Sequence, residues 1–308
     1  MESLQNIECF VRSAEAGSFA KAARLLGLTP AAVGKNVGKL EQSLGVRLFQ
    51  RTTRSLALTE EGRRFLDDAR SGLGLIQSAV ANLASAGGQP AGPLKVSLGT
   101  VYVRNYIIPL LPTFLAANPG VTPDFHFDNH PVDLVRDGFD AALGGGFELP
   151  PGVMARRLAP AHRVLVASAS FARAARVTSP ADLASHPGIL VRSPRTGRVP
   201  TLPLRNAAGA QEPINLQPRI LMSDPDACCQ AAMQSLGIAL ASMPQAFPYL
   251  ADARLVRILP DWHVDAGHIA VYFPAQKFLP AKTRAFVDFV AEAFTTLKLP
   301  RKFDATRA

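Results

Sequence analysis

The stretch that decides the fold runs from Ser18 to Leu44 and reads SFAKAARLLGLTPAAVGKNVGKLEQSL. Apolar residues recur at three- and four-residue steps on both sides of Gly27-Leu28, which predicts two helices separated by a sharp turn. Ser18 is a favourable N-cap for the first helix, and Thr29 followed by Pro30 is the order that starts the second. The stretch therefore predicts a helix-turn-helix unit.

The outer face of the second helix is small or basic. Lys35 and Lys39 lie opposite its apolar stripe and beside small residues such as Ala31, so this face can approach a nucleic acid duplex closely and reach its phosphates. Residues 46–49 and 55–58 are then predicted to form the two strands of a wing.

The wing is expected to add cationic contacts. Arg51 and Arg54 lie at its predicted tip, where arginines can follow the phosphate backbone or enter a minor groove. Seven basic residues and one acidic residue lie between Lys21 and Arg54, and a compact cationic segment of this kind fits a polyanion. A solvated basic face without any partner is the alternative.

A long helix is predicted from Thr59 onward, because Glu60 and Glu61 follow a capping hydroxyl and favour a helix N-terminus. Its apolar residues are spaced 3, 4, 3, 4, 3, which is the seam of a coiled coil. We expect the seam to pair two copies of the chain; the alternative is a helix that packs on its own domain. The predicted dimerisation residues are Leu66, Ala69, Leu73, Ile76, Val80 and Leu83.

The remaining chain has an α/β rhythm, in which short apolar strands alternate with helical stretches such as 104–117 and 281–297. Gly and Pro before it read as a hinge. The predicted organisation is a winged helix-turn-helix domain over 1–58, a linker helix over 59–88, a hinge over 89–93, an α/β domain over 94–298 and a frayed tail over 299–308. Within the α/β domain, one subdomain covers about 94–165 and 270–298, and the other covers about 166–269.

Residues 3 to 66 resemble the winged helix-turn-helix of LysR-type transcriptional regulators. The resemblance implies a sequence-specific contact with double-stranded DNA. One departure is Gly34, where the family usually has Ser or Thr, and Lys35 stands where Arg or Gln is common. The residues that carry the resemblance include Ser18-Phe19-Ala20-Lys21-Ala22-Ala23, Thr29-Pro30-Ala31-Ala32-Val33, Leu40-Glu41, Leu44-Gly45-Val46-Arg47-Leu48-Phe49, Arg51-Thr52-Thr53-Arg54 and Leu58-Thr59-Glu60-Glu61-Gly62. The DNA-binding residues predicted in this way are Ser18, Thr29, Pro30, Ala31, Gly34, Lys35, Lys39, Arg51 and Arg54.

The α/β part is similar to the effector-binding domain of the same family. The motifs include Pro109-Leu110-Leu111-Pro112, Gly138-Phe139-Asp140-Ala141-Ala142, Leu236-Gly237-Ile238-Ala239-Leu240 and Leu259-Pro260-Asp261-Trp262. The resemblance implies two α/β subdomains like those of periplasmic binding proteins, with a small effector in the cleft between them. Helix N-termini at such a cleft favour an anion. The predicted effector-binding residues are Thr100, Val101, Tyr102, Val103, Gly145, Phe147, Ser193 and Ser223.

Composition excludes several other classes of protein. A 308-residue chain with three cysteines and a net charge of +9 has no disulfide framework and fits a cytoplasmic protein. The sequence shows no apolar run long enough for a membrane helix, no metal-ligand spacing and no catalytic motif, so no cofactor, metal or enzymatic activity is expected.

Three interpretations of the chain are open. It is a transcriptional regulator, a solute-binding or enzymatic α/β domain with a dispensable N-terminal unit, or a purely architectural DNA-binding protein. The regulator is preferred. Its oligomer is expected to be a dimer through the linker helix, and a tetramer follows from the resemblance alone. The effector, the operator, the sign of regulation and any redox role of Cys228 and Cys229 do not follow from the sequence.

Overall fold

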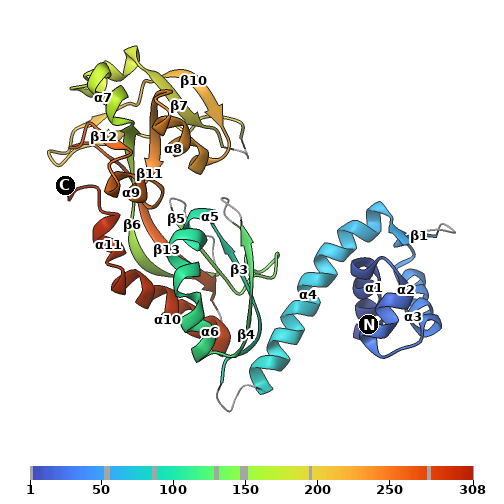
Figure 1. Ribbon diagram of the computed structural model, residues 1–308. Coiled ribbons are helices and arrows are strands. Elements are labelled where there is room, and N and C mark those ends of the chain that lie inside the picture. The colour runs from blue at the N-terminus through green and yellow to red at the C-terminus, as the bar shows by residue number, and fades with distance from the viewer. Residues whose placement is uncertain are drawn as a thin grey trace.

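A computed structural model describes residues 3–51, 56–84, 89–127, 132–145, 152–193, 196–275 and 279–307. An N-terminal helical unit and a larger α/β unit are joined by the long helix α4 (Glu60–Ala84), as Figure 1 shows. The predicted fold class, a helix-turn-helix followed by an α/β domain, is confirmed. Within the described residues, no helix combines the length and the apolar character needed to cross a membrane.

Three helices form the N-terminal unit: α1 (Leu4–Ala16), α2 (Phe19–Leu26) and α3 (Pro30–Leu44). Each ends at a glycine with a positive φ, between 62° and 69°, a conformation that glycine adopts without steric cost. Their buried faces meet around Phe10, Val33 and Leu40, which are all fully buried. The two helices predicted on either side of Gly27 are therefore confirmed.

The wing consists of β1 (Phe49–Arg51) and β2 (Leu56–Leu58), which pair antiparallel with Phe49 opposite Leu58. The predicted first strand, 46–49, begins too early. The backbone N–H groups of Leu48 and Phe49 instead donate hydrogen bonds to the Glu41 carboxylate, at 2.9 and 3.1 Å. These amides are therefore unavailable to a strand partner.

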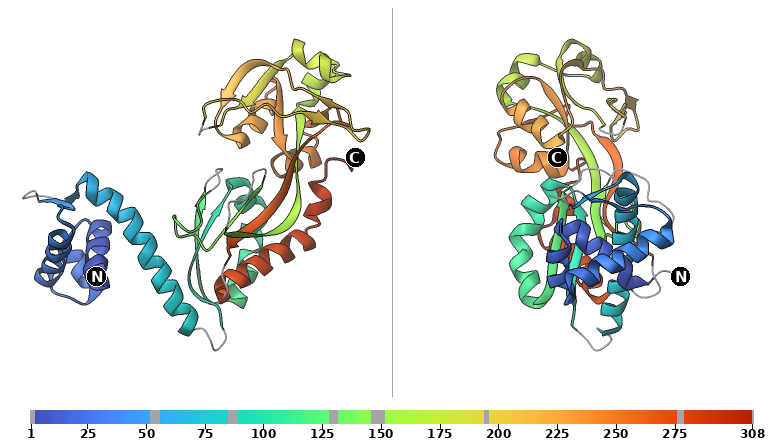
Figure 2. Two further views of the ribbon diagram at one scale, coloured as in Figure 1. Left: turned by 180° about the vertical axis from the view of Figure 1, so that it is seen from behind. Right: turned by 90° about the vertical axis from the view of Figure 1, so that its right-hand side faces the viewer.

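The α/β unit is built on one continuous sheet with the strand order β10-β7-β11-β6-β13-β5-β3-β4, and β12 pairs with β6 off this path. Strands β6 and β13 are long and antiparallel, and they run through both subdomains (Figures 1 and 2). The strands are β3 (Ala91–Leu98), β4 (Gly120–Phe127), β5 (Ala141–Gly145), β6 (Val153–Ala167), β7 (Pro187–Val191), β8 (Leu204–Arg205), β9 (Gln211–Glu212), β10 (Gln217–Met222), β11 (Ile238–Ser242), β12 (Val256–Ile258) and β13 (Val264–Pro274).

Helices cover this sheet and connect its strands. Residues 104–117, predicted as one helix, form a succession of short helices instead, because Pro109 and Pro112 lack the N–H group that a continuous helix needs. The helices are α5 (Thr100–Tyr102), the π-helical η1 (Val103–Ile107), the 3₁₀ helix η2 (Ile108–Leu110), α6 (Leu111–Ala117), α7 (Ala169–Ala175), the 3₁₀ helix η3 (Pro180–Ser185), α8 (Pro225–Met233), α9 (Met243–Ala251), α10 (Ala281–Thr296) and α11 (Leu299–Lys302).

The predicted hinge over 89–93 overlaps strand β3, in which Ala91, Gly92 and Pro93 pair with β4. A proline is tolerated there because β5 pairs with β3 only from Val96 onward, so β5 needs no N–H from Pro93, and the Pro93 carbonyl instead accepts from Lys282 Nζ.

The predicted frayed tail is also wrong. It contains α11, and the side chains of Leu299, Phe303 and Ala305 are buried, with Phe303 fully enclosed. An apolar residue in a terminal segment is enough to dock that segment when the domain offers a matching core.

Candidate functional site

The exposed side of α3 is the first candidate surface. Val33, Val37 and Leu40 turn into the core of the N-terminal unit, whereas Ala31, Lys35 and Lys39 are exposed on the opposite side. Gly34 leaves open space, since a Cβ built there meets no atom within 4 Å. The helix therefore presents a small, cationic face, as its spacing predicted.

Exposed cations extend this surface beyond α3. Lys21 and Arg24 of α2 are exposed as well. Among the described residues, no carboxylate lies within 4.0 Å of any of these four cations, Lys21, Arg24, Lys35 and Lys39. Unpaired surface cations keep their full attraction for phosphates, which makes this face the electrostatic footprint expected of a duplex contact.

Three of the predicted contact residues lie at the starts of helices. Thr29 Oγ1 accepts from the Ala32 amide at 3.2 Å, and Pro30 is the first residue of α3. This cap leaves the Thr29 side chain exposed at the end of the helix. Ser18 takes the N-cap position of α2 but makes no side-chain capping bond.

Glu41 was not among the predicted site residues, and it positions the wing relative to α3. Its side chain is 5% exposed, and besides the two amides it accepts from Arg47 Nη1 at 3.1 Å. A buried carboxylate with three donors holds the chain firmly where it turns from α3 to β1. The motif Leu40-Glu41, followed by Arg47, was the sequence signal for this role.

Of the two wing arginines, the structure describes only the backbone of Arg51. Arg51 ends β1, opposite Leu56, but its side chain lies outside the described part of the structure. Arg54 lies entirely outside it. Their predicted contact with DNA stays a prediction.

The predicted dimer seam on α4 divides into two parts. Ala69 belongs to the buried core of the N-terminal unit, and Leu66 and Leu73 pack against that core. Ile76, by contrast, is 43% exposed. The first half of the seam thus follows the alternative of a helix packed on its own domain. The side chains of Val80 and Leu83 lie outside the description.

The stretch after β3 was predicted to bind the effector, and its side chains alternate in direction. Val101 and Val103 are 6% and 1% exposed and belong to the main core, so their side chains pack inside the protein. Thr100 is exposed and Tyr102 is half-buried. These two remain the residues of the stretch that a ligand can reach.

The other predicted effector residues differ in role. Gly145 ends β5, and a Cβ on it would lie 2.5 Å from the His268 carbonyl oxygen, so the close approach of β13 accounts for this glycine. Ser193 follows β7 and is half-buried, and Ser223 follows β10 and is exposed. The Arg192 amide donates to the Met222 carbonyl at 2.8 Å, which places these two strand ends together. Phe147 lies outside the described residues.

Two contacts bring the two subdomains together beside Tyr102. Arg104 of η1 forms an ion pair of 2.9 Å with Asp226 in the first turn of α8. The Tyr106 hydroxyl donates to the Pro244 carbonyl of α9 at 2.9 Å. The predicted surfaces after β3 and β10 therefore do lie near each other, and the charge of Arg104 is compensated within the protein.

Arg163 is a charged residue of this region that the sequence analysis missed. It lies on β6, between Ser242 of β11 and Val264 of β13, and it is half-buried. Burial lowers the pKa of its guanidinium, and the charge interaction that opposes this shift comes from Tyr102. Among the described residues, no carboxylate lies within 4.0 Å of it. The signal was a lone arginine that opens the apolar run Val164-Leu165-Val166-Ala167.

The cysteines and metal-binding groups give no further site. Cys228 and Cys229 are buried at the start of α8, and burial raises the pKa of Cys228 to about 11 and that of Cys229 to about 12. Both thiols are thus protonated at neutral pH, which disfavours the reactive thiolate. In the described part of the chain, no group of three or more His, Cys, Asp or Glu side chains could hold a metal ion.

Two family models match the chain. "Bacterial regulatory helix-turn-helix protein, lysR family" matches residues 4–63, and "LysR substrate binding domain" matches residues 87–295. Among similar curated proteins, an HTH-type transcriptional repressor of Pseudomonas aeruginosa is 31% identical over 295 residues, which cover 96% of this chain and 93% of that protein. The HTH-type transcriptional regulator DmlR of Escherichia coli is 30% identical and covers 94% of each chain.

Solved structures share the arrangement of domains. CrgA, a LysR-type transcriptional regulator from Neisseria meningitidis, superposes with a TM-score of 0.58 and 26% identity over 94% of this chain and 98% of its own. The full-length Vibrio cholerae virulence activator AphB superposes with a TM-score of 0.61 and 24% identity, over 94% of this chain and 99% of its own. The likeness to AphB concerns the fold alone.

Proposed function

The chain belongs to the LysR family of DNA-binding transcriptional regulators, which are not enzymes, and from this premise we propose how its own residues contact DNA and effector. α3 enters the major groove with Lys35 and Lys39 toward the phosphates and base edges, and Ala31, Gly34, Thr29 and Pro30 allow close approach. Ser18 and the wing arginines, Arg51 and Arg54, flank this contact. The observation that carries the proposal is the exposed cationic face of α3, whose lysines have no carboxylate within 4.0 Å among the residues that the structure describes.

The effector proposed for the α/β domain is an organic anion. The support comes from Arg163, which is half-buried and has no carboxylate within 4.0 Å in the described part of the chain, because such a guanidinium is costly until an anion compensates it. In this proposal, Thr100, Tyr102, Ser193 and Ser223 add hydrogen bonds to the same ligand. Such a ligand shifts the arrangement of the subdomains only by the difference in its affinity for their alternative positions.

Assembly as a homodimer is proposed through the distal half of α4. Ile76 is exposed, and Val80 and Leu83 continue the same heptad spacing. A helix that leaves its own domain with an apolar stripe is stabilised by a second copy of itself. A tetramer built from two such dimers, and a cytoplasmic location, complete the proposal.

Fluorescence anisotropy tests the DNA contact. The full-length protein is titrated onto labelled intergenic DNA beside its own gene and onto shuffled DNA, at several salt concentrations. Lys35→Ala combined with Lys39→Ala is expected to weaken binding at least tenfold and to reduce the salt slope by about 2, since each phosphate contact contributes roughly 0.9. A matched control, Arg173→Ala with Arg176→Ala, removes two exposed charges from α7 and its C-cap. Equal loss in both variants would reject α3 as the reader.

A variant of Arg163 tests the anionic effector. In the absence of small anions, Arg163→Gln is expected to unfold at the same or a higher urea concentration than the parent, because it removes an uncompensated charge. Stabilisation by a panel of mono- and dicarboxylates should disappear in Arg163→Gln and persist in Arg163→Lys. Clear destabilisation of Arg163→Gln without ligand would assign the guanidinium a purely structural role.

A further inference from the structure

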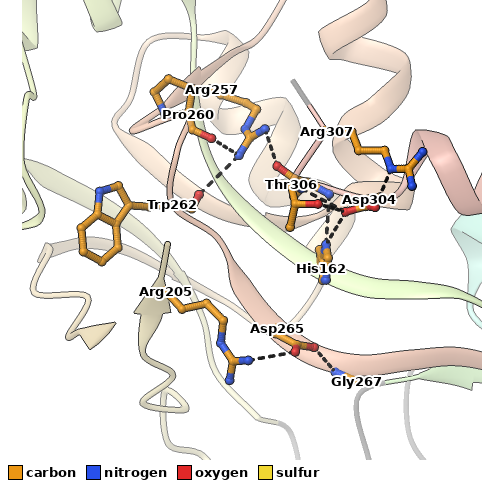
Figure 3. Close-up of polar contacts among 11 residues, drawn as sticks. His162, Arg205, Arg257, Pro260, Trp262, Asp265, Gly267, Asp304, Thr306 and Arg307 are labelled. Carbon is orange, nitrogen blue, oxygen red and sulfur yellow. Dashed lines mark hydrogen bonds and ion pairs between the residues drawn. The ribbon is translucent and has the colours of Figure 1, made fainter. Parts of the chain in front are cut away.

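A second concave site lies where the C-terminal segment meets α9, outside the junction assigned to the effector. The pocket has a volume of about 540 Å³, which is in the range of small-molecule sites. Its walls come from α9 and β12 on one side, and from residues between Lys298 and Arg307 on the other. Figure 3 shows Arg257 and Arg307, two of the lining residues, beside the docked tail.

The charge of the lining has one sign. Five of the nine lining residues are Lys or Arg, and none is acidic. Arg257 is already used by the fold, because its guanidinium donates to the carbonyls of Ala305, at 2.9 Å, and of Pro260. Arg307 forms an ion pair of 3.1 Å with Asp304. Partners within the protein therefore neutralise or hold only some of the five cationic side chains that line the pocket.

Lys298 and Arg301 are two of the lining cations left for a ligand, and Lys302 is a third. Lys298 and Arg301 are exposed at the pocket, and neither has a carboxylate within 4.0 Å among the residues that the structure describes. Lys298 is the N-cap of α11 and has a left-handed backbone with φ of 54°, and Arg301 lies three residues further along in the same short helix. Both side chains therefore come from one short turn of the C-terminal segment.

The floor of the pocket is apolar. Met243, Phe247 and Leu250 of α9 line it, and Phe247 and Leu250 are half-buried rather than enclosed. Lys302 lies over the Phe247 ring, with its Nζ 5.4 Å from the ring centre. A hydrophilic anion would use the cations alone, whereas an anion with an aromatic or aliphatic body would use both parts of the site.

We propose that this pocket binds a small amphipathic anion, a carboxylate or sulfonate on an apolar body, as a second ligand site of the regulator. On one side of the site lies α9, which follows β11 in one subdomain. On the other side lies α11, which follows α10, and α10 packs on β3 and β6 in the other subdomain. A ligand here bridges the two subdomains from the side of the C-terminus. It therefore biases the same arrangement that the effector biases, and it does so independently of Arg163.

Isothermal titration of the full-length protein with 2-naphthoate tests the site, with 2-naphthamide as the neutral analogue and acetate as the anion without an apolar body. The Arg163→Gln background is used throughout, so that binding at the subdomain junction does not contribute. Saturable binding of 2-naphthoate alone is expected. Lys298→Gln with Arg301→Gln should weaken it roughly tenfold, the effect of removing two exposed charge contacts.

The matched control is Arg173→Gln with Arg176→Gln. It removes the same charge from one helical residue and from one residue with a left-handed backbone, with φ of 49°, and it should leave binding unchanged. Equal affinity for the amide, or unchanged affinity in the Lys298 and Arg301 variant, overturns the proposal. A loss of DNA affinity in that variant, with naphthoate binding intact, would assign these cations to the phosphate backbone instead.

Discussion

At the scale of single residues, tight backbone contacts decide the geometry of the N-terminal DNA-binding unit. Glu41 accepts both amides at the start of the wing, and Gly62 in the first turn of α4 lies directly against the same segment. A Cβ on Gly62 would be 2.1 Å from the Leu48 carbonyl oxygen, which is backbone and cannot rotate away. The wing, α3 and the linker helix are thus linked through residues 48 and 62.

Gly62→Ala is expected to destabilise the N-terminal unit by about 2 kcal/mol or more, because the clash forces α4 away from Leu48. Urea unfolding with DNA anisotropy on the same samples measures this loss and the accompanying loss of affinity. Gly74→Ala is the matched control on the same helix, since a Cβ there meets nothing within 4 Å. It should be neutral or stabilising by up to about 1 kcal/mol through helix propensity. Equal stability of both variants would show that the contact at Gly62 is not restrictive.

At the scale of elements, α4 serves two different surfaces along one apolar stripe. Its first turns complete the core of the helix-turn-helix, where α4 packs against α1. Further along, the same stripe leaves that core, and Ile76 is exposed. The heptad spacing is the same in both halves, because either a neighbouring helix of the same chain or a partner helix satisfies it.

Substitutions in the two halves of the stripe are expected to separate folding from assembly. Ile76→Glu should give a folded monomer at micromolar concentration, since it places a charge in the proposed dimer seam. Ala69→Glu should unfold the N-terminal unit, because Ala69 is only 9% exposed and a buried unpaired carboxylate is costly. Sedimentation velocity and circular dichroism distinguish the two results. A dimeric Ile76→Glu protein would place the interface elsewhere.

At the scale of the whole molecule, the C-terminal segment closes the α/β unit near the junction of its subdomains. The Ala305 amide donates to His162 Nδ1 of β6 at 3.0 Å, and the His162 ring lies tilted by 44° against the His263 ring, with centres 4.6 Å apart (Figure 3 shows His162). This hydrogen bond requires a neutral Nδ1. Burial lowers the pKa of His162 below its ordinary value of 6.5, against the opposing charges of Asp265 and Asp304 and with the support of Arg205 and Arg257.

The stability of the α/β unit is therefore expected to depend on pH. The unfolded chain takes up a proton on His162 near pH 6.5, whereas the folded protein resists it, so stability is complete above that pH and falls as the pH drops below it. The pKa of His263 is lowered in the same direction, by burial and then by His162. Urea midpoints at pH 7.5 and 5.5 measure the loss.

His162→Asn should reduce this pH dependence, because an amide oxygen can accept from Ala305 without titrating. His268→Asn, which replaces an exposed histidine of β13, is the control and should behave like the parent protein. A difference between the two pH values that is the same in all three proteins would rule out His162 as the titrating group.

The sequence by itself determined the local structure and the family. Capping residues, glycines at helix ends and three-to-four spacing are short-range signals, so Ser18, Thr29, Gly27 and the face with Lys35 could be read without coordinates. For the same reason, the resemblance sufficed for the fold class and for the DNA-binding function.

Only the tertiary structure decided which equivalent patterns meet which partner. A heptad stripe is compatible with packing against α1 or against a second chain. The sequence around Thr100 likewise does not show that Val101 and Val103 turn into the core. Arg163 and the pocket beside Lys298 and Arg301 depend on segments more than 40 residues apart along the chain. Burial and charge compensation are properties of the packed chain, and the packing is what assigned these residues their roles.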